Sequence, residues 1–178
     1  MLAIVLLVAT YPIVAVLRLW ILAVDGRPTL FGQPRFAAGD TTVRLWKIRT
    51  MKTTHSYANS PRRADGSLLP VADRTVLLKG ASAIRRLGLD ELPQLSLIAQ
   101  GKMAFIGPRP LPLEFEEHQQ KRAIWIRPGL TGAAQARGRS GIDLEARAVL
   151  DTEYETNASL AFDLRILLRT AHTIGSKA

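Results

Sequence analysis

The first long feature of the hydrophobic pattern is an apolar run from Met1 to Val24, in which residues 1–17 carry no charge. A helix that spans a bilayer needs about 20 apolar residues, so the length of the run leaves two arrangements open. One is a single transmembrane helix, with the basic residues that follow it holding the rest of the chain in the cytoplasm. The other is a re-entrant helix that breaks at Pro12 and returns to the same side. A signal peptide is disfavoured, because no basic segment precedes the run and no clear cleavage site follows it.

Short β-strands are predicted next, where polar and apolar residues alternate over a few positions. The pieces Thr29–Phe31 and Thr42–Ile48 have this pattern, and Gly39-Asp40 between them predicts a hairpin. The segment Lys52–Asp73 is polar, rich in turn-forming residues and without periodicity, so we expect a loop. Such a loop either covers a bound substrate or is a surface insertion.

Helical periodicity accounts for most of the remaining chain. The predicted helices are Val76–Arg86, a helix that starts near Asp90, Leu113–Trp125, Asp143–Tyr154 and a last helix capped by Ser159. The fold class is therefore α+β and helix-dominated. It combines an N-terminal membrane-associated helix over 1–24 with one compact domain over 25–178 that contains a small β element.

Two adjacent carboxylates, Asp90 and Glu91, stand in an otherwise apolar segment. Proline is tolerated in the first turn of a helix, so Pro93 places the helix start near Asp90 and makes Asp90 the expected N-cap. We expect the helix dipole and nearby arginines to favour the ionised form of both acids. An ionised carboxylate can attack phosphorus or bind a hard cation. The plain alternative is a capped helix with solvated charges.

Three loops carry arginines on backbone that suits anion binding. Arg109 lies between Pro108 and Pro110, where the fixed φ angles would hold its guanidinium against a phosphate at little entropic cost. A plain structural crossover would not require this arginine. The glycine-rich loops 127–132 and 137–141 combine arginines with exposed backbone N–H groups, which can form an anion cradle.

Composition and charge narrow the class of partner. The net charge is +9, and residues 18–109 hold 15 basic and 6 acidic residues, whereas residues 110–178 hold 9 of each. The excess charge thus lies beside the membrane segment, which favours an anionic lipid surface or a phosphorylated ligand. Nucleic acid is disfavoured, because aromatic residues are sparse and no nucleic-acid motif is present. The chain has no cysteine, and its three histidines show no metal-ligand spacing.

Several motifs, in this order and at this spacing, resemble the bacterial sugar transferase family. They are KIRTM at 47–51, GLDELPQL at 88–95, GKMAFIGPRPLP at 101–112, RPGLTGAAQARGR at 127–139 and FDLRILLRT at 162–170. Members of this family are monotopic phosphoglycosyl transferases that begin glycan assembly on a polyprenol carrier. The chain departs from the family pattern at Gly88, where Ser or Thr is common, and at Lys102, where Asp is common. Members also usually have a few residues, one of them basic, before the apolar run.

The resemblance implies a reaction and a place for it. A phosphosugar would pass from a nucleoside diphosphate sugar, UDP-linked in the expected case, to polyprenol phosphate through a covalent aspartyl intermediate. The protein would lie at the bacterial inner membrane, with a re-entrant (monotopic) helix over 1–24 broken at a proline and its catalytic domain, 25–178, on the cytoplasmic face. A homodimer is compatible with the sequence. By resemblance, Asp90 and Glu91 are catalytic and bind Mg²⁺. The implied substrate-binding residues are Lys47, Arg49, Arg86, Gln94, Pro108, Arg109, Pro110, Thr131, Gln135, Arg139 and Asp163.

A second hypothesis is that the protein is not catalytic. A membrane-anchored basic module that binds anionic lipids or a phosphorylated partner would explain both the charge and the apolar run. It would leave the adjacent acid pair and its accompanying arginines without a role. Replacement of Asp90 by asparagine discriminates the two, because a lipid binder should tolerate the change whereas the enzyme should lose nearly all turnover.

Overall fold

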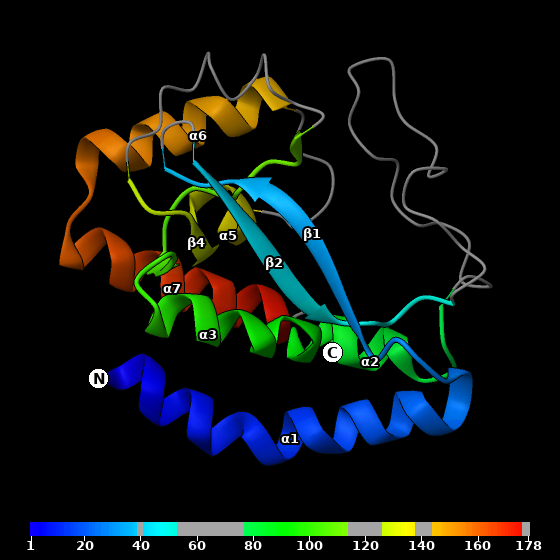
Figure 1. Ribbon diagram of the computed structural model, residues 1–178. Helices are drawn as coiled ribbons and strands as arrows, with labels where there is room; N and C mark the ends of the chain where they lie inside the picture. Colours follow the sequence, from blue (N-terminus) through cyan, green and yellow to red (C-terminus); the bar gives the residue numbers. More distant parts are fainter. Residues whose placement is uncertain (39–40, 53–76, 114–125, 138–143, 176–178) are drawn as a thin grey trace. The chain divides into compact units, whose positions relative to one another are not determined.

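The computed structural model describes residues 1–38, 41–52, 77–113, 126–137 and 144–175, and it confirms a helix-rich α+β fold (Figure 1). Its elements are α1 (Leu2–Asp25), β1 (Leu30–Phe36), β2 (Thr42–Ile48), α2 (Ala81–Arg86), η3 (Leu89–Gln94), α3 (Leu95–Ala99), β3 (Ala104–Ile106), β4 (Gly129–Thr131), α5 (Ala133–Arg137), α6 (Leu144–Asn157) and α7 (Leu160–Gly175). The predicted turn at Gly39-Asp40, most of the loop Lys52–Asp73 and most of the helix Leu113–Trp125 lie outside the described residues.

The chain divides into two units, each with its own core. Unit 1 comprises Met1–Gly32 and Leu45–Ala99, and unit 2 comprises Gln33–Arg44 and Gln100–Ala178. The core of unit 1 is built from Ile21, Ile48, Leu78 and Ala81, all buried. The core of unit 2 is built from Ala133, Ala134, Ala136, Leu150, Tyr154 and Ile166. The predicted boundary between residues 24 and 25 stays a prediction.

Helix α1 is long and apolar enough to cross a membrane, and it leaves most of its apolar side chains exposed. An exposed apolar surface of this size indicates membrane anchoring. We expected a break at Pro12, but the helix continues through it. The Thr10 hydroxyl donates to the Leu6 carbonyl at 2.7 Å, one turn back, and not to the Val8 carbonyl that Pro12 leaves without its N–H donor. The re-entrant path itself stays a prediction.

Strands β1 and β2 form a two-stranded sheet, and the second strand has the bounds that the sequence predicts. Strand β1 is longer than predicted because it continues past Pro34. Proline lacks a ladder donor but is tolerated in an edge strand, and both strands of a two-stranded sheet are edges. Val43 and Leu45 are buried, whereas Trp46 on the other face is exposed. The Trp46 ring lies so close over Gly32 that a Cβ there would collide with it.

The helix expected to start at Asp90 begins one residue earlier and in a different form. The segment Leu89–Gln94 is a 3₁₀-helix whose N-cap is Gly88, with φ +71°, so the expectation that Asp90 is the N-cap is wrong. The Glu91 N–H bonds back to the Gly88 carbonyl at 3.1 Å, and the tighter turn places both acids in its first turn. Likewise, α2 begins only at Ala81, because the preceding chain pairs with the residues that follow β2.

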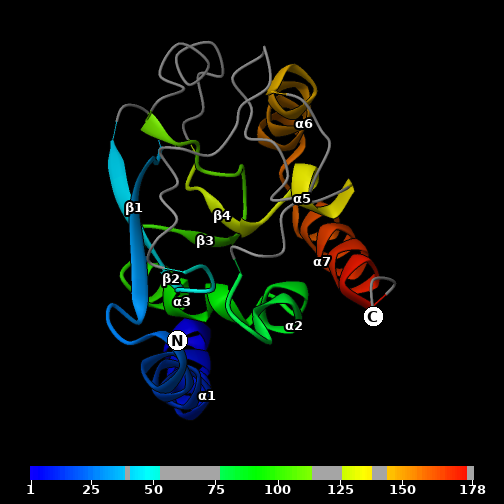
Figure 2. The ribbon, with the colours of Figure 1, turned by 90° about the vertical axis from the view of Figure 1, so that its right-hand side faces the viewer.

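Unit 2 contains a second small sheet with helices packed beside it (Figure 2). Strands β3 and β4 are parallel, with Ala104 opposite Gly129 and Ile106 opposite Thr131. Helix α7 packs against both strands and against α5. Its predicted cap is confirmed, since the Ser159 hydroxyl accepts the Phe162 N–H at 3.3 Å. Helix α6 extends three residues beyond its predicted end at Tyr154.

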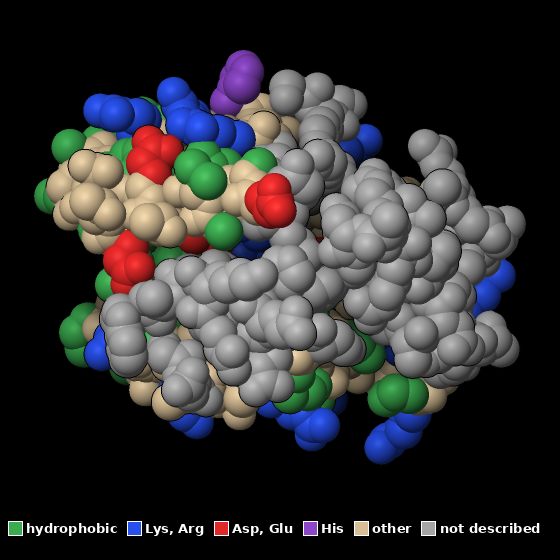
Figure 3. Space-filling view, turned by 90° about the horizontal axis from the view of Figure 1, so that it is seen from above, with side chains coloured by type: hydrophobic (Ala, Val, Ile, Leu, Met, Phe, Trp, Pro, Cys, Tyr) green, Lys and Arg blue, Asp and Glu red, His purple; other side chains and the backbone are tan. Residues whose placement is uncertain are grey.

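Lys and Arg outnumber Asp and Glu in the chain, which gives the net charge of +9. On the face drawn in Figure 3, described Lys and Arg side chains gather at the margins of the view. Such a surface attracts anionic ligands and lipid headgroups over distances of about 8–10 Å at physiological ionic strength.

Candidate active site

The acid pair occupies a partly buried position in the first turn of η3. Burial raises the pKa of the Asp90 carboxyl above its ordinary value, and the neighbouring Glu91 charge adds to this rise. The Lys47 and Arg85 charges and the Asp90 backbone N–H act in the opposite sense without outweighing burial. The Arg85 charge favours ionisation of Asp90 as expected, but burial outweighs it, so the net shift of the Asp90 pKa is upward. A carboxylate that is poorly solvated is a stronger base and nucleophile than an exposed one.

Lys47 is the cation that directly accompanies the acid pair. Its Nζ donates to Glu91 Oε1 at 2.6 Å, and the two side chains are 24% and 20% exposed. Lys47 points to the same face of β2 as the buried Val43 and Leu45, so the strand itself aims it at η3. The two partners are 44 positions apart in the chain, so this pair is a tertiary feature.

Two further predicted residues lie on the helical segments of unit 1. Arg86 is exposed and is not among the charges that shift the Asp90 pKa, whereas its neighbour Arg85 is. Gln94 is 3% exposed at the end of η3, so its amide faces the protein interior. The substrate-binding roles assigned to Arg86 and Gln94 stay predictions.

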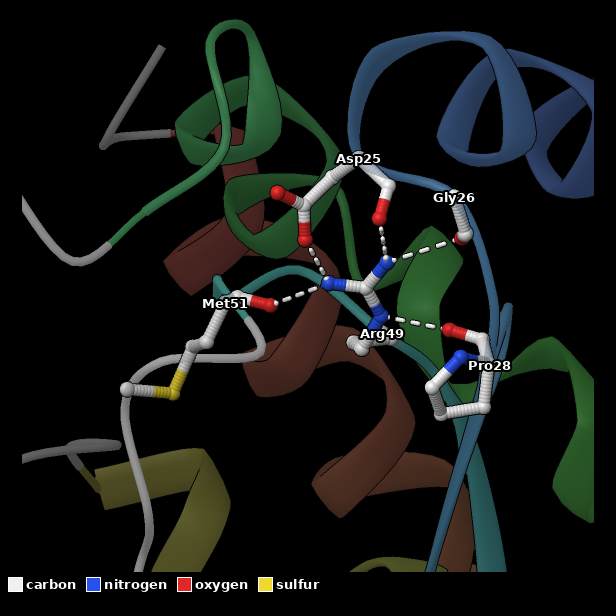
Figure 4. Close-up of polar contacts among 5 residues, drawn as sticks. All are labelled: Asp25, Gly26, Pro28, Arg49 and Met51. Carbon is white, nitrogen blue, oxygen red and sulfur yellow. Dashed lines mark hydrogen bonds and ion pairs between the residues drawn. The ribbon is translucent and has the colours of Figure 1, made fainter.

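Arg49 forms a clamp on the chain that follows the membrane helix (Figure 4). Its guanidinium is 7% exposed and pairs with the Asp25 carboxylate. It also donates to the carbonyls of Asp25, Gly26, Pro28 and Met51. All five N–H donors are thus used within the chain, which leaves none for a ligand. The contacts assign Arg49 a positioning role in place of the predicted substrate contact.

The Pro-Arg-Pro loop of unit 2 is held from both sides. On one side, Pro108 is fully buried and its carbonyl accepts the Gly129 N–H at 3.0 Å. On the other, Arg35 Nη1 donates to the Pro110 carbonyl at 3.2 Å. Arg109, half-buried between these points, is therefore carried on pinned backbone. This agrees with the stiffness that the prolines predict.

Close backbone contact explains the glycines beside this loop. A Cβ on Gly132 would collide with the Gly107 carbonyl, and one on Gly129 would collide with the Gly107 N–H nitrogen. The Gly107 N–H in turn donates to the Thr131 carbonyl at 3.0 Å. Glycines at these positions let β4 approach the loop that carries Arg109.

The other predicted residues of unit 2 have different environments. The Thr131 hydroxyl lies 2.8 Å from the Thr170 hydroxyl of α7. Gln135 is 7% exposed, and within the described residues neither polar atom of its amide has a hydrogen-bond partner. Asp163 accepts the Tyr154 hydroxyl at 2.7 Å. Arg139 lies outside the described residues.

Sequence reasoning missed three residues that hold these groups in place. Asp25 receives Arg49, Arg35 supports Pro110, and Tyr154 joins Asp163. Burial and the Asp163 charge raise the pKa of Tyr154, so its hydroxyl stays a donor. Tyr154 lies on α6, where periodicity reports only its burial, and the other two resemble ordinary exposed charges. No local signal could have identified any of the three.

The carboxylate pair suits a magnesium site of a particular kind. Among the described residues, no group of three or more His, Cys, Asp or Glu side chains could enclose a metal. Mg²⁺ usually binds through one or two carboxylates and completes its shell with water and substrate phosphates. Asp90 and Glu91 fit that pattern, and they do not form an all-protein cage.

Comparison with known proteins places this geometry in context. The family model for bacterial sugar transferases matches residues 1–177. The uncharacterized sugar transferase EpsL of Bacillus subtilis (strain 168) is 37% identical over 164 residues, which is 90% of this chain and 75% of that protein. An undecaprenyl-phosphate glucose phosphotransferase of Komagataeibacter xylinus is 33% identical over 94% of this chain and 33% of its own length.

A UDP-glucose:undecaprenyl-phosphate glucose-1-phosphate transferase of Xanthomonas campestris pv. campestris is 28% identical, over 99% of this chain and 38% of its own length. The chain thus spans three quarters of the Bacillus protein and little more than a third of either longer relative.

Proposed function

The chain belongs to the bacterial sugar transferase family, and from that premise we propose that it transfers a sugar phosphate from a nucleoside diphosphate sugar to polyprenol phosphate. The observation that carries the proposal is the partly buried acid pair with Lys47 held 2.6 Å from Glu91. The names of two relatives support a UDP-sugar donor and an undecaprenyl phosphate acceptor. The experiment described below would identify the sugar that is transferred.

Two displacements at the same phosphorus make up the proposed reaction. In the first, an Asp90 carboxylate oxygen attacks the sugar-proximal phosphorus, and the bond to the nucleoside monophosphate breaks with its electron pair on the leaving phosphate. In the second, an oxygen of polyprenol phosphate attacks that phosphorus and the aspartyl oxygen leaves. The carboxylate is restored, and the products are the nucleoside monophosphate and a polyprenyl diphosphate sugar.

The environment of Asp90 supports this role. Burial lowers the solvation of the carboxylate, which favours attack on a phosphorus that enters the same partly buried site. Lys47 lies where it can compensate the negative charge that a diphosphate brings to the acid pair. Arg109, on the rigid backbone of unit 2, stays a predicted phosphate-binding residue, and its guanidinium would lose little entropy on binding.

Mg²⁺ belongs to the proposal as the cofactor of the acid pair. Asp90 and Glu91 would hold it, and when bound it would supply charge neutralisation at the phosphate oxygens. Lys47 Nζ donates to Glu91 Oε1 at 2.6 Å and would hold that carboxylate in its orientation.

The membrane helix suits an amphiphilic acceptor. We propose that α1 anchors the protein monotopically in the bacterial inner membrane, with the globular part on the cytoplasmic face, where nucleotide sugars are made. Cysteines introduced one at a time at the exposed positions Leu2 and Lys52 would test this, since both should react with an impermeant maleimide only after the membrane is opened. Labelling of Leu2→Cys alone from the outer side would show a spanning helix.

The decisive experiment is nucleotide release by the detergent-solubilised protein with Mg²⁺, polyprenol phosphate and a panel of UDP-sugars. UMP release with one donor, lost in Asp90→Asn and kept in the exposed-carboxylate control Glu145→Gln, would support the proposal and identify the sugar. Release of UDP would indicate ordinary glycosyl transfer and refute the phosphosugar mechanism. Rapid quenching should trap radiolabelled sugar on the protein before acceptor is added, and Asp90→Asn should carry none.

A further inference from the structure

A groove with a cavity volume of about 590 Å³ runs along one flank of α1, within unit 1. One wall is a stripe of α1 at helical spacing, with Tyr11, Ala15 and Leu22 among its members. The other wall is the chain from Arg27 to Leu30 together with Trp46 of β2. Figure 2 shows α1 nearly end-on with the start of β1 beside it.

The two ends of the groove differ in chemistry. Most of its lining is apolar, whereas Arg18 and Arg27 provide two cations at the end near the exit of α1. The Arg18 Nε donates across the groove to the Thr29 hydroxyl at 3.1 Å, which aims the guanidinium between the walls. Within the described part of the chain, neither arginine forms an ion pair with a carboxylate. An apolar channel with two available cations at one end complements an anionic amphiphile.

The wall opposite α1 is rigid. Arg49 binds the carbonyls of Gly26 and Pro28 on either side of Arg27, so the clamp described above fixes this edge of the groove. Trp46 is seated over Gly32 and is 37% exposed at the rim. Tryptophan is favoured at the level of lipid headgroups, where an amphipathic ring has both an apolar and a polar neighbourhood.

We propose that this groove binds an anionic membrane phospholipid, with its phosphate at Arg18 and Arg27 and an acyl chain along α1. The alternation of β2 separates it from the acid pair, because Trp46 and Lys47 are adjacent and point to opposite faces of the strand. Lys47 reaches Glu91, whereas Trp46 lines the groove. Trp46 and Lys47 thus serve different sites, and we assign the groove a bound lipid, with the acceptor as the alternative that the test below separates.

Fluorescence of Trp46 tests the proposal locally. Trp20→Phe and Trp125→Phe leave Trp46 as the single reporter, and phosphatidylglycerol with brominated acyl chains quenches a tryptophan that it touches. We expect phosphatidylglycerol to quench at lower mole fraction than phosphatidylcholine with the same chains. Arg18→Gln with Arg27→Gln should weaken the apparent affinity for phosphatidylglycerol roughly 25-fold, because each cation near a lipid phosphate contributes about fivefold.

Matched variants make the result specific. Lys52→Gln with Lys79→Gln removes two exposed charges from the same unit outside the groove and should keep the preference. Ala15→Phe fills the groove without a change of charge and should reduce quenching by both lipids. Asp90→Asn should leave quenching unchanged, so the outcome is independent of the proposed reaction.

Three results would overturn the proposal. They are equal quenching by the two lipids, a preference that survives loss of both arginines, and displacement of phosphatidylglycerol by an equimolar amount of polyprenyl phosphate. The last would identify the groove as the acceptor site.

Discussion

Opposite substitutions in the Lys47–Glu91 pair should move the Asp90 pKa in opposite directions. Lys47→Met removes the cation that lowers this pKa, and Glu91→Gln removes the anion that raises it. Because the two charges are 2.6 Å apart, they nearly cancel at Asp90 in the native protein. Lys47→Met therefore leaves one net negative charge beside Asp90, and Glu91→Gln leaves one net positive charge there. Both variants keep roughly the same side-chain volume.

The size of the shift follows from the position of the two acids in the chain. Carboxylates on adjacent residues are about 7 Å apart, because consecutive Cα atoms are separated by about 3.8 Å. A unit charge at about 7 Å, in a partly exposed site with an effective dielectric constant of about 20–40, changes the energy of ionisation by about 1.2–2.4 kcal/mol. That is about 0.9–1.7 pKa units. We expect Lys47→Met to raise the Asp90 pKa, and Glu91→Gln to lower it, by about one unit each.

Carboxyl ¹³C NMR of protein labelled at aspartate would measure both shifts without reliance on turnover. The Asp90 signal is identified by its loss in Asp90→Asn, and Lys52→Met serves as the control, since it removes an exposed lysine outside the site. Where turnover survives, the acidic limb of the pH–rate profile should move the same way, because attack requires the ionised carboxylate. Shifts of the same sign in both variants, or no shift in either, would refute the electrostatic account of the acid pair.

Three further predictions concern stability. Asp90→Asn should raise the melting temperature at pH 7, because the Asp90 pKa is raised in the folded protein and its ionised form therefore costs stability above that pKa. The gain in melting temperature should shrink as the pH falls toward the ordinary pKa of an aspartate, as calorimetry at pH 7 and at that lower pH would show. Arg49→Lys should lower the free energy of unfolding by about 2–4 kcal/mol in denaturant titrations, because lysine leaves buried carbonyls unpaired, whereas the exposed Arg86→Lys should change it by less than about 0.5 kcal/mol. Gly132→Ala should cost about 1–3 kcal/mol, since its Cβ must displace the Gly107 carbonyl; an unchanged midpoint would contradict the close approach of loop and strand.

The sequence correctly predicted those helices and strands whose position depends on residues close to them in the chain. The alternation of Thr42–Ile48 and the serine before α7 gave correct assignments, because each depends on neighbouring residues. Strand β1 was predicted too short because Pro34 is a breaker everywhere except at a sheet edge, and edges are a property of the assembled sheet. The N-cap was misplaced because Gly88 adopts a left-handed conformation that no periodicity reports.

In the candidate site, too, the sequence identified individual residues but did not predict the contacts between distant ones. Family motifs identified Asp90, Glu91 and Lys47 as residues of interest, but the ion pair between positions 47 and 91 is set by tertiary packing. The sign of the Asp90 pKa shift depends on burial, which the charges written in the sequence do not reveal. The motif that contains Arg49 likewise does not distinguish a guanidinium that meets a substrate from one that binds the chain itself.

The clamp at Arg49 also bears on the order in which the protein is made. Helix α1 ends in Asp25, an acid at the negative pole of the helix dipole, and its last turn contains no basic residue. The cation that compensates the Asp25 carboxylate and the helix end is Arg49, 24 positions later in the chain. During synthesis, the apolar helix can therefore reach a bilayer while its end is still uncompensated. The exit point of α1 is therefore fixed only once the chain through Arg49 has been made, because that guanidinium binds Asp25 and the carbonyl of Gly26.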